Sequence, residues 1–241
     1  PAQPLPASSA HRAWGSGARC VTPLPSRWFA CSISPTDAVR RVEGEAAVAR
    51  WSRSLDGRAQ AWLELTPATV DGARAKLDVK DIEAIDFAID QVRFFHEATA
   101  PKPQTVETGP GVRATRVWRP IQACGLYVPA GTAPLVSTLI MLAEPARAAG
   151  VPGRVLVSPP NKNGETHPAI TIAAAACGLT GIWLVGGAQA IAALSFGAGV
   201  LKADKIFGPG NAYVAEAKRY AASLPGGPAI DLPAGPSELM V

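Results

Sequence analysis

From Ile121 onward, short apolar runs alternate with alanine-rich stretches, and this alternation constrains the fold more than any other feature of the chain. The apolar runs predict five strands, at residues 125–128, 154–158, 181–185, 204–207 and 229–232. The alanine-rich stretches predict four helices between them, roughly at 134–149, 165–177, 188–196 and 211–223. Strands and helices in this order build an open, mostly parallel sheet whose ligand crevice lies at the carboxyl ends of the strands.

Before residue 121 the pattern is mainly helical. Helices are predicted at residues 37–53, 66–77 and 81–99, and a hairpin at 105–107 and 112–117. The third helix has the clearest period, because Ile82, Ile85 and Ile89 share one face. We therefore predict an α/β fold in which a helical N-terminal segment precedes an incomplete Rossmann-like, mostly parallel α/β domain.

Composition and charge argue against two kinds of partner. The chain is 48% hydrophobic, yet no apolar run reaches the roughly 20 residues that a membrane span needs. Most of the net charge of +4 lies in residues 1–36, which hold three arginines and no acid, so the rest of the chain is close to neutral. Without a clustered basic face, neither nucleic acid nor a membrane is expected as a partner.

The cysteines and the first residues bear on location. The four cysteines, at positions 20, 31, 124 and 177, form no C-x-x-C pair, and no secretory signal is recognisable before them. Reduced thiols of this kind predict a cytoplasmic protein. Residues 1–35 are acid-poor and without a clear period, and we interpret them as a disordered leader, with a transit peptide as the alternative.

Two glycine-rich turns follow strands of the predicted sheet. One contains Gly186 and Gly187, and the other contains Gly208 and Gly210. Glycine lets the backbone approach a ligand closely, and the first turn of a helix offers unpaired N–H groups. Neither a G-x-G-x-x-G fingerprint nor a Walker A loop is present, which excludes kinase and P-loop ATPase interpretations. The turns therefore predict one crevice for a nucleotide-sized molecule.

Aromatic and polar side chains fall at the same predicted edge of the sheet. The ring of Tyr127 is suited to packing on adenine or nicotinamide, and the amides of Gln189 and Asn211 are suited to a carboxamide or a ribose. Each also has a purely structural interpretation. Asn211 and Ser237 can cap helices, Gln189 can be a solvated first-turn residue, and Tyr127 can be a core aromatic. Their convergence on one edge favours the binding interpretation.

Four motifs stand at these strand ends: G-L-Y-V-P at 125–129, V-G-G-A-Q-A-I-A-A-L at 185–194, D-K-I-F-G-P-G-N at 204–211 and D-L-P-A-G-P-S-E at 231–238. Together they make the chain similar to the histidinol dehydrogenase family, from about residue 37 to Val241. The resemblance implies NAD-dependent oxidation of L-histidinol to L-histidine through the aldehyde. It also implies that Tyr127, Gln189 and Asn211 contact NAD and that Ser237 contacts the substrate.

The resemblance implies a division of the chain as well. Residues 1–35 form a leader that does not resemble the family, 36–120 a helical segment and hairpin of an incomplete first domain, 121–236 the α/β NAD-binding domain, and 237–241 the start of a return to the first domain. With that first domain incomplete, the face that carries Ile82, Ile85 and Ile89 is expected to be exposed. Full-length members are expected to be cytoplasmic homodimers.

The chain departs from the family in its catalytic motifs. The family's zinc ligands and its Glu-His pair of general bases follow the segment that ends here at Val241, and His11, His96 and His167 match none of them. No catalytic or metal-binding residue is therefore predicted, zinc is expected only in full-length members, and these 241 residues alone are expected to be inactive. Two alternatives stay open: a related NAD-dependent dehydrogenase of another small alcohol, such as a sulfonated diol, and a non-catalytic nucleotide-binding module.

Overall fold

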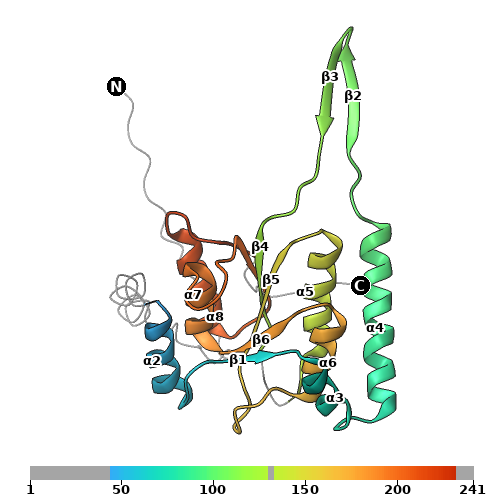
Figure 1. Cartoon of the computed structure of the whole chain (residues 1–241). Coiled ribbons are helices and arrows are strands. Elements are labelled where there is room, and N and C mark those ends of the chain that lie inside the picture. Colours follow the sequence, from blue (N-terminus) through green and yellow to red (C-terminus); the bar gives the residue numbers. More distant parts are fainter. Residues whose placement is uncertain (1–43, 130–132, 232–241) are drawn as a thin grey trace, which may run out of the picture.

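A six-stranded sheet forms the centre of the computed structural model, which describes residues 44–129 and 133–231. Its strands are β1 (Ala61–Glu64), β4 (Ala123–Tyr127), β5 (Gly153–Ser158), β6 (Gly181–Leu184), β7 (Lys205–Phe207) and β8 (Ala229–Ile230). The strand order is β1-β6-β5-β4-β7-β8 (Figure 1). All neighbours are parallel except β1, which pairs antiparallel with β6. This arrangement confirms the predicted mostly parallel α/β sheet.

Helices cover both faces of the sheet. They are α2 (Glu45–Asp56), α3 (Pro67–Arg74), α4 (Val79–Ala98), α5 (Val136–Ala148), α6 (Pro168–Ala176), α7 (Gly187–Phe196) and α8 (Ala212–Ser223). Helices α3 to α6 lie on one face and α2, α7 and α8 on the other (Figure 1). The strands alternate accordingly, because Leu156 and Ile182 belong to the core under α4, α5 and α6, whereas Val157 and Trp183 belong to the core under α7 and α8.

The helix boundaries differ from the predicted ones by a few residues, for local reasons. Helix α6 begins at Pro168, since proline is favoured at a first helical position and His167 caps the helix by accepting a hydrogen bond from the Ala169 N–H. Helix α2 runs to Asp56 and ends at Gly57, which has a φ of 73°. The predicted start of this helix at residue 37 lies outside the described residues.

Strand β1 is absent from the sequence-based prediction. Its four residues are mostly exposed, Trp62 among them, so the strand shows no alternation of buried and exposed side chains. It is a strand because it pairs along its length with β6, where Trp62 stands opposite Trp183. The segment before residue 121 therefore contributes an edge strand to the same sheet, while the proposed division of the chain into domains stays a prediction.

Helix α4 does expose apolar side chains, as expected, but not at Ile85 and Ile89. Ile85 and Ile89 are only 7% and 2% exposed, because α5 and α6 pack over them. The exposed apolar side chains of α4 lie elsewhere on its surface, where Phe87, Phe94 and Phe95 are 67%, 74% and 60% exposed. The helix is therefore anchored to the sheet domain by one face and presents three aromatic rings outside that contact.

A buried carboxylate joins α4 to α5. Glu144 has a fully buried side chain and accepts hydrogen bonds from Arg93 at 3.0 and 3.2 Å and from Arg147 at 2.9 Å. Burial acts to raise the pKa of Glu144, but the hydrogen bonds and charges of the two arginines outweigh it and hold that pKa below its ordinary value. Arg147 also pairs with Glu97 near the end of α4. The network fixes the register of the two helices.

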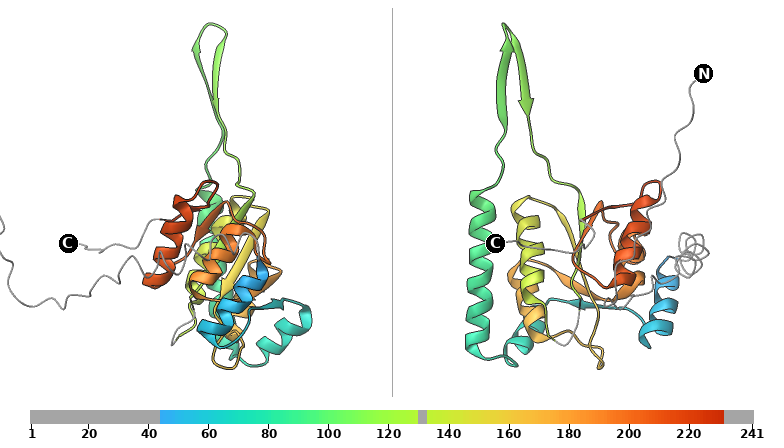
Figure 2. Two further views of the ribbon diagram at one scale, coloured as in Figure 1. Left: turned by 90° about the vertical axis from the view of Figure 1, so that its left-hand side faces the viewer. Right: turned by 180° about the vertical axis from the view of Figure 1, so that it is seen from behind.

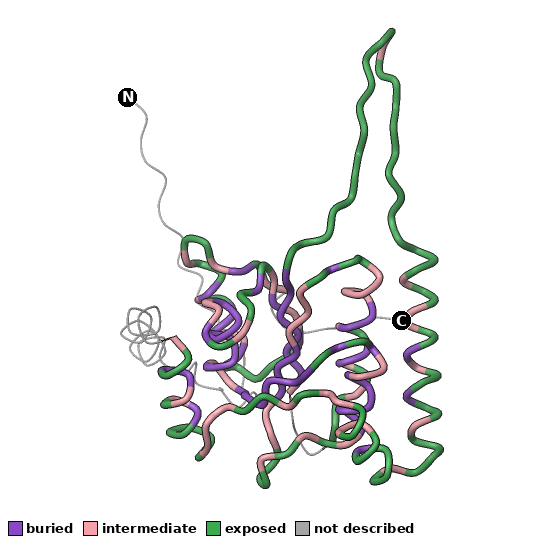
Figure 3. Tube along the Cα trace, in the orientation of Figure 1, coloured by how far each residue is buried: buried purple, intermediate pink, exposed green. Residues whose placement is uncertain are grey.

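The hairpin of β2 (Gln104–Gly109) and β3 (Val112–Arg116) projects away from the rest of the molecule (Figures 1 and 2). Nearly all of its residues are exposed, in contrast to the central strands β4 and β6, whose residues are all buried (Figure 3). It confirms the predicted hairpin. Its two strands are held by their own ladder and by a contact between the Thr105 and Thr115 hydroxyls, 3.0 Å apart.

Two observations concern membranes and thiols. Within the described ranges, no helix has both the length and the apolar character required to cross a bilayer. Cys124 and Cys177 are free and buried, and burial raises their pKa to about 11 and about 12. These two thiols are therefore protonated core residues near neutral pH. The other two cysteines of the chain lie outside the described residues.

Candidate functional site

Tyr127 connects the end of β4 to the turn after β6. The residue is 3% exposed, and its hydroxyl accepts a hydrogen bond from the Gly187 N–H at 3.4 Å. Burial raises the pKa of the Tyr127 phenol, the hydrogen bond from Gly187 opposes that shift, and the negative charge of Asp56 adds to it. The phenol is therefore a neutral, buried group at the carboxyl edge of the sheet, beside the first residue of α7.

The backbone of Tyr127 also contacts the turn after β7. Gly208 has a φ of 122°, and a Cβ at this position would stand 1.9 Å from the Tyr127 carbonyl oxygen. No residue other than glycine fits there without displacing backbone. Tyr127 thus contacts both glycine turns: its hydroxyl contacts the turn at Gly187, and its carbonyl group contacts the turn at Gly208.

A partly buried ion pair holds the second turn. Lys218 of α8 donates from Nζ to the Gly208 carbonyl oxygen and to Asp231 Oδ1, each at 2.6 Å. Asp231 Oδ2 in turn accepts from the Gly208 N–H at 2.8 Å. Both polar backbone groups of Gly208 are therefore satisfied by the same two side chains, which fixes the turn that leads into Asn211.

Asn211 caps α8, as its structural interpretation requires. Its Oδ1 accepts from the Val214 N–H at 3.0 Å, and its backbone is extended. The side chain is nevertheless exposed at the edge of the sheet, and the cap uses the amide oxygen only. The two N–H donors of the Asn211 amide are consequently left for a ligand in addition to the cap.

The structural alternative for Gln189, a solvated residue in the first turn of a helix, is wrong. It is 5% exposed, and its Nε2 donates to Asp56 Oδ2 at 2.6 Å. Asp56 is the last residue of α2, so this hydrogen bond joins the helix that precedes β1 to the first turn of α7. The structure thereby brings Tyr127, Gln189 and Asp56 to one region at the carboxyl end of β4 and β6.

The turn after β6 forms the start of α7. Helix α7 begins at Gly187 with no side-chain cap; the Gly187 N–H donates to the Tyr127 hydroxyl, and the N–H groups of Ala188 and Gln189 follow it in the first turn. A Cβ at Gly186 would stand 2.7 Å from Pro159, and one at Gly187 would stand 2.8 Å from Gln189 Oε1. The lack of a Cβ at these two positions lets Pro159 and the Gln189 side chain pack against the turn, close to the Tyr127 hydroxyl and Asp56.

The fourth predicted site residue and the histidines remain to be placed. Ser237 lies outside the described residues. His167 caps α6 and His96 lies in the last turn of α4. Over residues 44–129 and 133–231, no group of three His, Cys, Asp or Glu side chains is arranged to hold a metal ion. No residue of this part of the chain is assigned to zinc.

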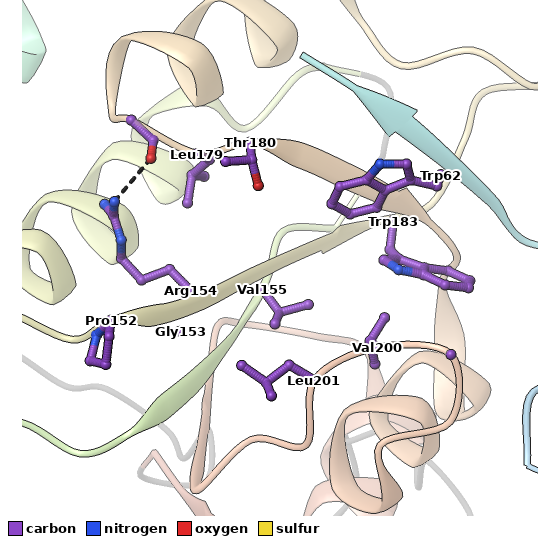
Figure 4. Close-up of a pocket in the computed structure, with 12 residues that line it drawn as sticks. Trp62, Pro152, Gly153, Arg154, Val155, Leu179, Thr180, Trp183, Val200 and Leu201 are labelled. Atoms are coloured by element: carbon purple, nitrogen blue, oxygen red, sulfur yellow. Dashed lines mark hydrogen bonds between the residues drawn. The ribbon is translucent and has the colours of Figure 1, made fainter. Parts of the chain in front are cut away.

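A cavity of about 580 Å³ lies at the opposite end of the strands, where β5 and β6 begin (Figure 4). Trp62, Trp183 and Leu201 line it together with Arg154. The Arg154 guanidinium points away from the tryptophans and donates to the carbonyl oxygens of Cys177 and Gly178, at 3.0 and 2.9 Å (Figure 4). Arg154 therefore caps the C-terminal end of α6. The cavity is separate from the region around Tyr127.

Three site residues were not predicted from the sequence. In the sequence, Asp56 only follows the predicted helix at 37–53, Lys218 only falls within the predicted helix at 211–223, and Asp231 is only the first residue of a motif. A signal exists for Lys218, because it stands seven residues after Asn211 and so lies on the same side of the helix. None exists for Asp56, whose partner Gln189 is 133 positions away.

The chain matches known proteins over most of its length. The family model described as histidinol dehydrogenase matches residues 36–241. The histidinol dehydrogenase of Colwellia psychrerythraea is 46% identical over 200 residues, which cover 83% of this chain and 46% of that protein. The histidinol dehydrogenase of Salmonella typhimurium is 45% identical over 221 residues, which cover 87% of this chain and 50% of that protein.

Among solved structures, the crystal structure of histidinol dehydrogenase from Elizabethkingia anophelis superimposes with a TM-score of 0.80 at 34% identity. The match covers 89% of this chain and 52% of that one. The chain thus spans about half the length of the curated relatives it matches. These matches lend no support to a dehydrogenase of a sulfonated diol.

Proposed function

Because the chain belongs to the histidinol dehydrogenase family, we propose that it provides the NAD-binding part of an enzyme that oxidises L-histidinol to L-histidine through the aldehyde. One observation carries the proposal: Tyr127 lies against both glycine turns, through a hydrogen bond to Gly187 and a close backbone contact with Gly208. The turns that follow β6 and β7 therefore belong to a single site, as a dinucleotide requires.

In this proposal each polar group has a binding role. Bound NAD would supply the hydride acceptor for the alcohol. The uncapped first turn of α7 offers backbone N–H groups, and Asn211 offers its amide donors beside the cap. Tyr127 offers a neutral hydroxyl and ring, and the pair of Lys218 and Asp231 holds the second turn rigid. Rigid turns raise affinity because little conformational freedom is lost on binding.

NADH titration of the purified chain, followed by NADH fluorescence, tests the proposal. Gln189→Ala is expected to weaken binding about tenfold, because a buried hydrogen-bonding partner is removed. Asn211→Ser keeps a helix cap but removes the amide donors, and the same direction of change is expected. Arg113→Ala, on the distant hairpin, is the control and should bind as the parent does. Absence of NADH binding, or equal binding by all four proteins, would contradict the proposal.

The family resemblance extends the proposal beyond these turns. Ser237 is proposed to contact L-histidinol, and zinc is proposed for full-length members. We further propose that these members are cytoplasmic homodimers. The 241 residues by themselves are expected to bind NADH without oxidising L-histidinol, since the family's zinc-ligand and Glu-His motifs do not occur among them. NADH formation above a no-protein control, with L-histidinol and added zinc, would contradict that expectation.

A further inference from the structure

The side chain of Gln189 is held by a residue from another part of the chain. Its Nε2 donates to Asp56 Oδ2 at 2.6 Å, a short hydrogen bond between an amide and a carboxylate. Gln189 belongs to the first turn of α7 and Asp56 to the last turn of α2. Gln189 is only 5% exposed, so water does not compete strongly for the contact.

Local structure does not explain this contact. Gln189 is the third helical residue of α7, the position from which a glutamine commonly reaches back to the backbone N–H of the capping residue. No side-chain cap is made at Gly186. The Gln189 amide is instead turned to Asp56, so its orientation is set by a tertiary neighbour.

Asp56 stands where its own helix disfavours it. A carboxylate in the last turn of a helix lies at the negative end of the helix dipole. Glu45 in the first turn and Arg53 in the last turn of α2 have the favourable placement, and Asp56 departs from it. The helix dipole of α2 therefore gives no reason for a carboxylate at this position. The contact that Asp56 makes is the hydrogen bond from the Gln189 amide.

We propose that Asp56 is a positioning residue of the nucleotide site, which acts by fixing the orientation of the Gln189 amide. An ionised carboxylate only accepts hydrogen bonds, so it pairs with the nitrogen of the amide and never with its oxygen. The nitrogen is thereby directed to Asp56, and Oε1 lies next to the Cα of Gly187. The inference rests on the proposed function, because it assigns a task within that site.

The fixed orientation selects the chemistry that Gln189 offers to a ligand. Among the residues that the structure describes, no donor is assigned to Gln189 Oε1, which remains an acceptor beside the uncapped turn of α7. The group that it takes is an N–H or O–H donor of the dinucleotide. A ribose hydroxyl and the nicotinamide carboxamide both have this chemistry.

A double-mutant cycle in NADH binding tests the inference on the full 241-residue chain. Asp56→Ala and Gln189→Ala are each expected to weaken binding about tenfold, and the double variant is expected to lose no more than either single variant. Additive losses would mean that Asp56 contacts the nucleotide directly, and this result would overturn the positioning role. Asp56→Asn, whose oxygen can still accept from Gln189, is expected to restore binding to within about threefold.

Controls separate this inference from misfolding and from failure of the proposed function. Asp86→Ala removes an exposed carboxylate of α4 and should change nothing. The side-chain N–H₂ resonances of Gln189 in NMR spectra should shift in Asp56→Ala without ligand, which a purely structural role elsewhere would not cause. If Gln189→Ala weakens binding while Asp56→Ala does not, the positioning role alone fails. If the parent chain binds no NADH, both proposals fall.

ADP-ribose distinguishes the two sources of the donor. It has the ribose hydroxyls of NADH but lacks the nicotinamide. An equal loss of ADP-ribose and NADH affinity in Asp56→Ala would assign Gln189 Oε1 to a ribose hydroxyl, and a loss confined to NADH would assign it to the carboxamide.

Discussion

Lys218, which is buried, and Asp231, which is partly exposed, form an ion pair that also satisfies both polar backbone groups of Gly208. The Lys218 side chain is 6% exposed and that of Asp231 is 32% exposed. A buried charge is tolerated only where partners replace its water, and here the partners are a carboxylate and a carbonyl oxygen. The pair therefore stabilises the turn before Asn211 only as long as both members are present.

Lys218→Met is expected to destabilise the fold by about 1–3 kcal/mol, because it leaves Asp231 Oδ1 and the Gly208 carbonyl without the Lys218 donor. Urea unfolding followed by circular dichroism measures the change. Arg219→Met is the matched control on the next residue, whose side chain is 68% exposed and pairs with Glu216 on the surface. Such an exposed pair is screened by water and contributes little to stability. Equal losses in the two variants would refute a special role for Lys218.

Gly208→Ala is expected to be among the most damaging single substitutions in the chain. Its φ of 122° is unfavourable for a residue with a Cβ, and that Cβ would overlap the Tyr127 carbonyl oxygen at 1.9 Å. A loss of about 3 kcal/mol or more in the free energy of unfolding is expected. Gly72→Ala, in α3 with open space around it, is the contrast and should stabilise by about 0.5–1 kcal/mol. A Gly208→Ala variant as stable as the parent would show that the turn relaxes.

Glu144 should make stability depend on acid pH. Its pKa in the folded protein is held below the ordinary value by Arg93 and Arg147 against the effect of burial, so the unfolded chain binds its proton first as the pH falls. The contribution is complete above about pH 4.3, the ordinary glutamate pKa, and is lost as the pH falls through the lower folded value. Urea unfolding at several pH values between about 3 and 7 should show this loss in the parent and a flatter profile in Glu144→Gln. Identical profiles would refute it.

Tyr127 should ionise at a higher pH than an ordinary tyrosine. Burial raises its pKa, so absorbance near 295 nm should rise in a late step that Tyr127→Phe removes. Because the folded state keeps this proton longer than the unfolded chain, stability should fall as the pH rises past about 10. Loss of the hydroxyl also leaves the Gly187 N–H without its acceptor, which costs about 1 kcal/mol. A late step that persists in Tyr127→Phe would assign it to another residue.

The parallel sheet was predictable because its signals are local. Strands such as β4 and β6 are buried along their whole length and stand between alanine-rich helices, so apolar runs mark them directly. Strand β1 has no such signal, because its residues are mostly exposed and depend on β6 for their conformation. The burial of Ile85 and Ile89 was missed for a related reason, since the pattern shows an apolar face but not which helix covers it.

The candidate site divides in the same way. Tyr127, Gln189 and Asn211 stand at strand ends that the alternation of elements locates, so their shared edge followed from the sequence. The contacts that orient them did not. Asp56 reaches Gln189 from a helix that precedes the sheet, and Lys218 reaches Gly208 through the register of α8. The sequence carries no sign of the first pairing, which is set by packing across the fold, and only the helical spacing from Asn211 points to the second.

The hairpin of β2 and β3 is the covalent link between the segment from α2 to α4 and the segment from β4 to β8. It is exposed along both strands and lies between α4 and β4, so a protease has access to its turn near Gly111. A cut there leaves α2, β1, α3 and α4 on one fragment and the parallel strands on the other. Those fragments still share a sheet through β1 and β6 and a helical interface through α4 and α5. Continuity of the backbone at the hairpin is therefore dispensable for holding the two parts together, and the nicked protein should migrate as one species until it is denatured.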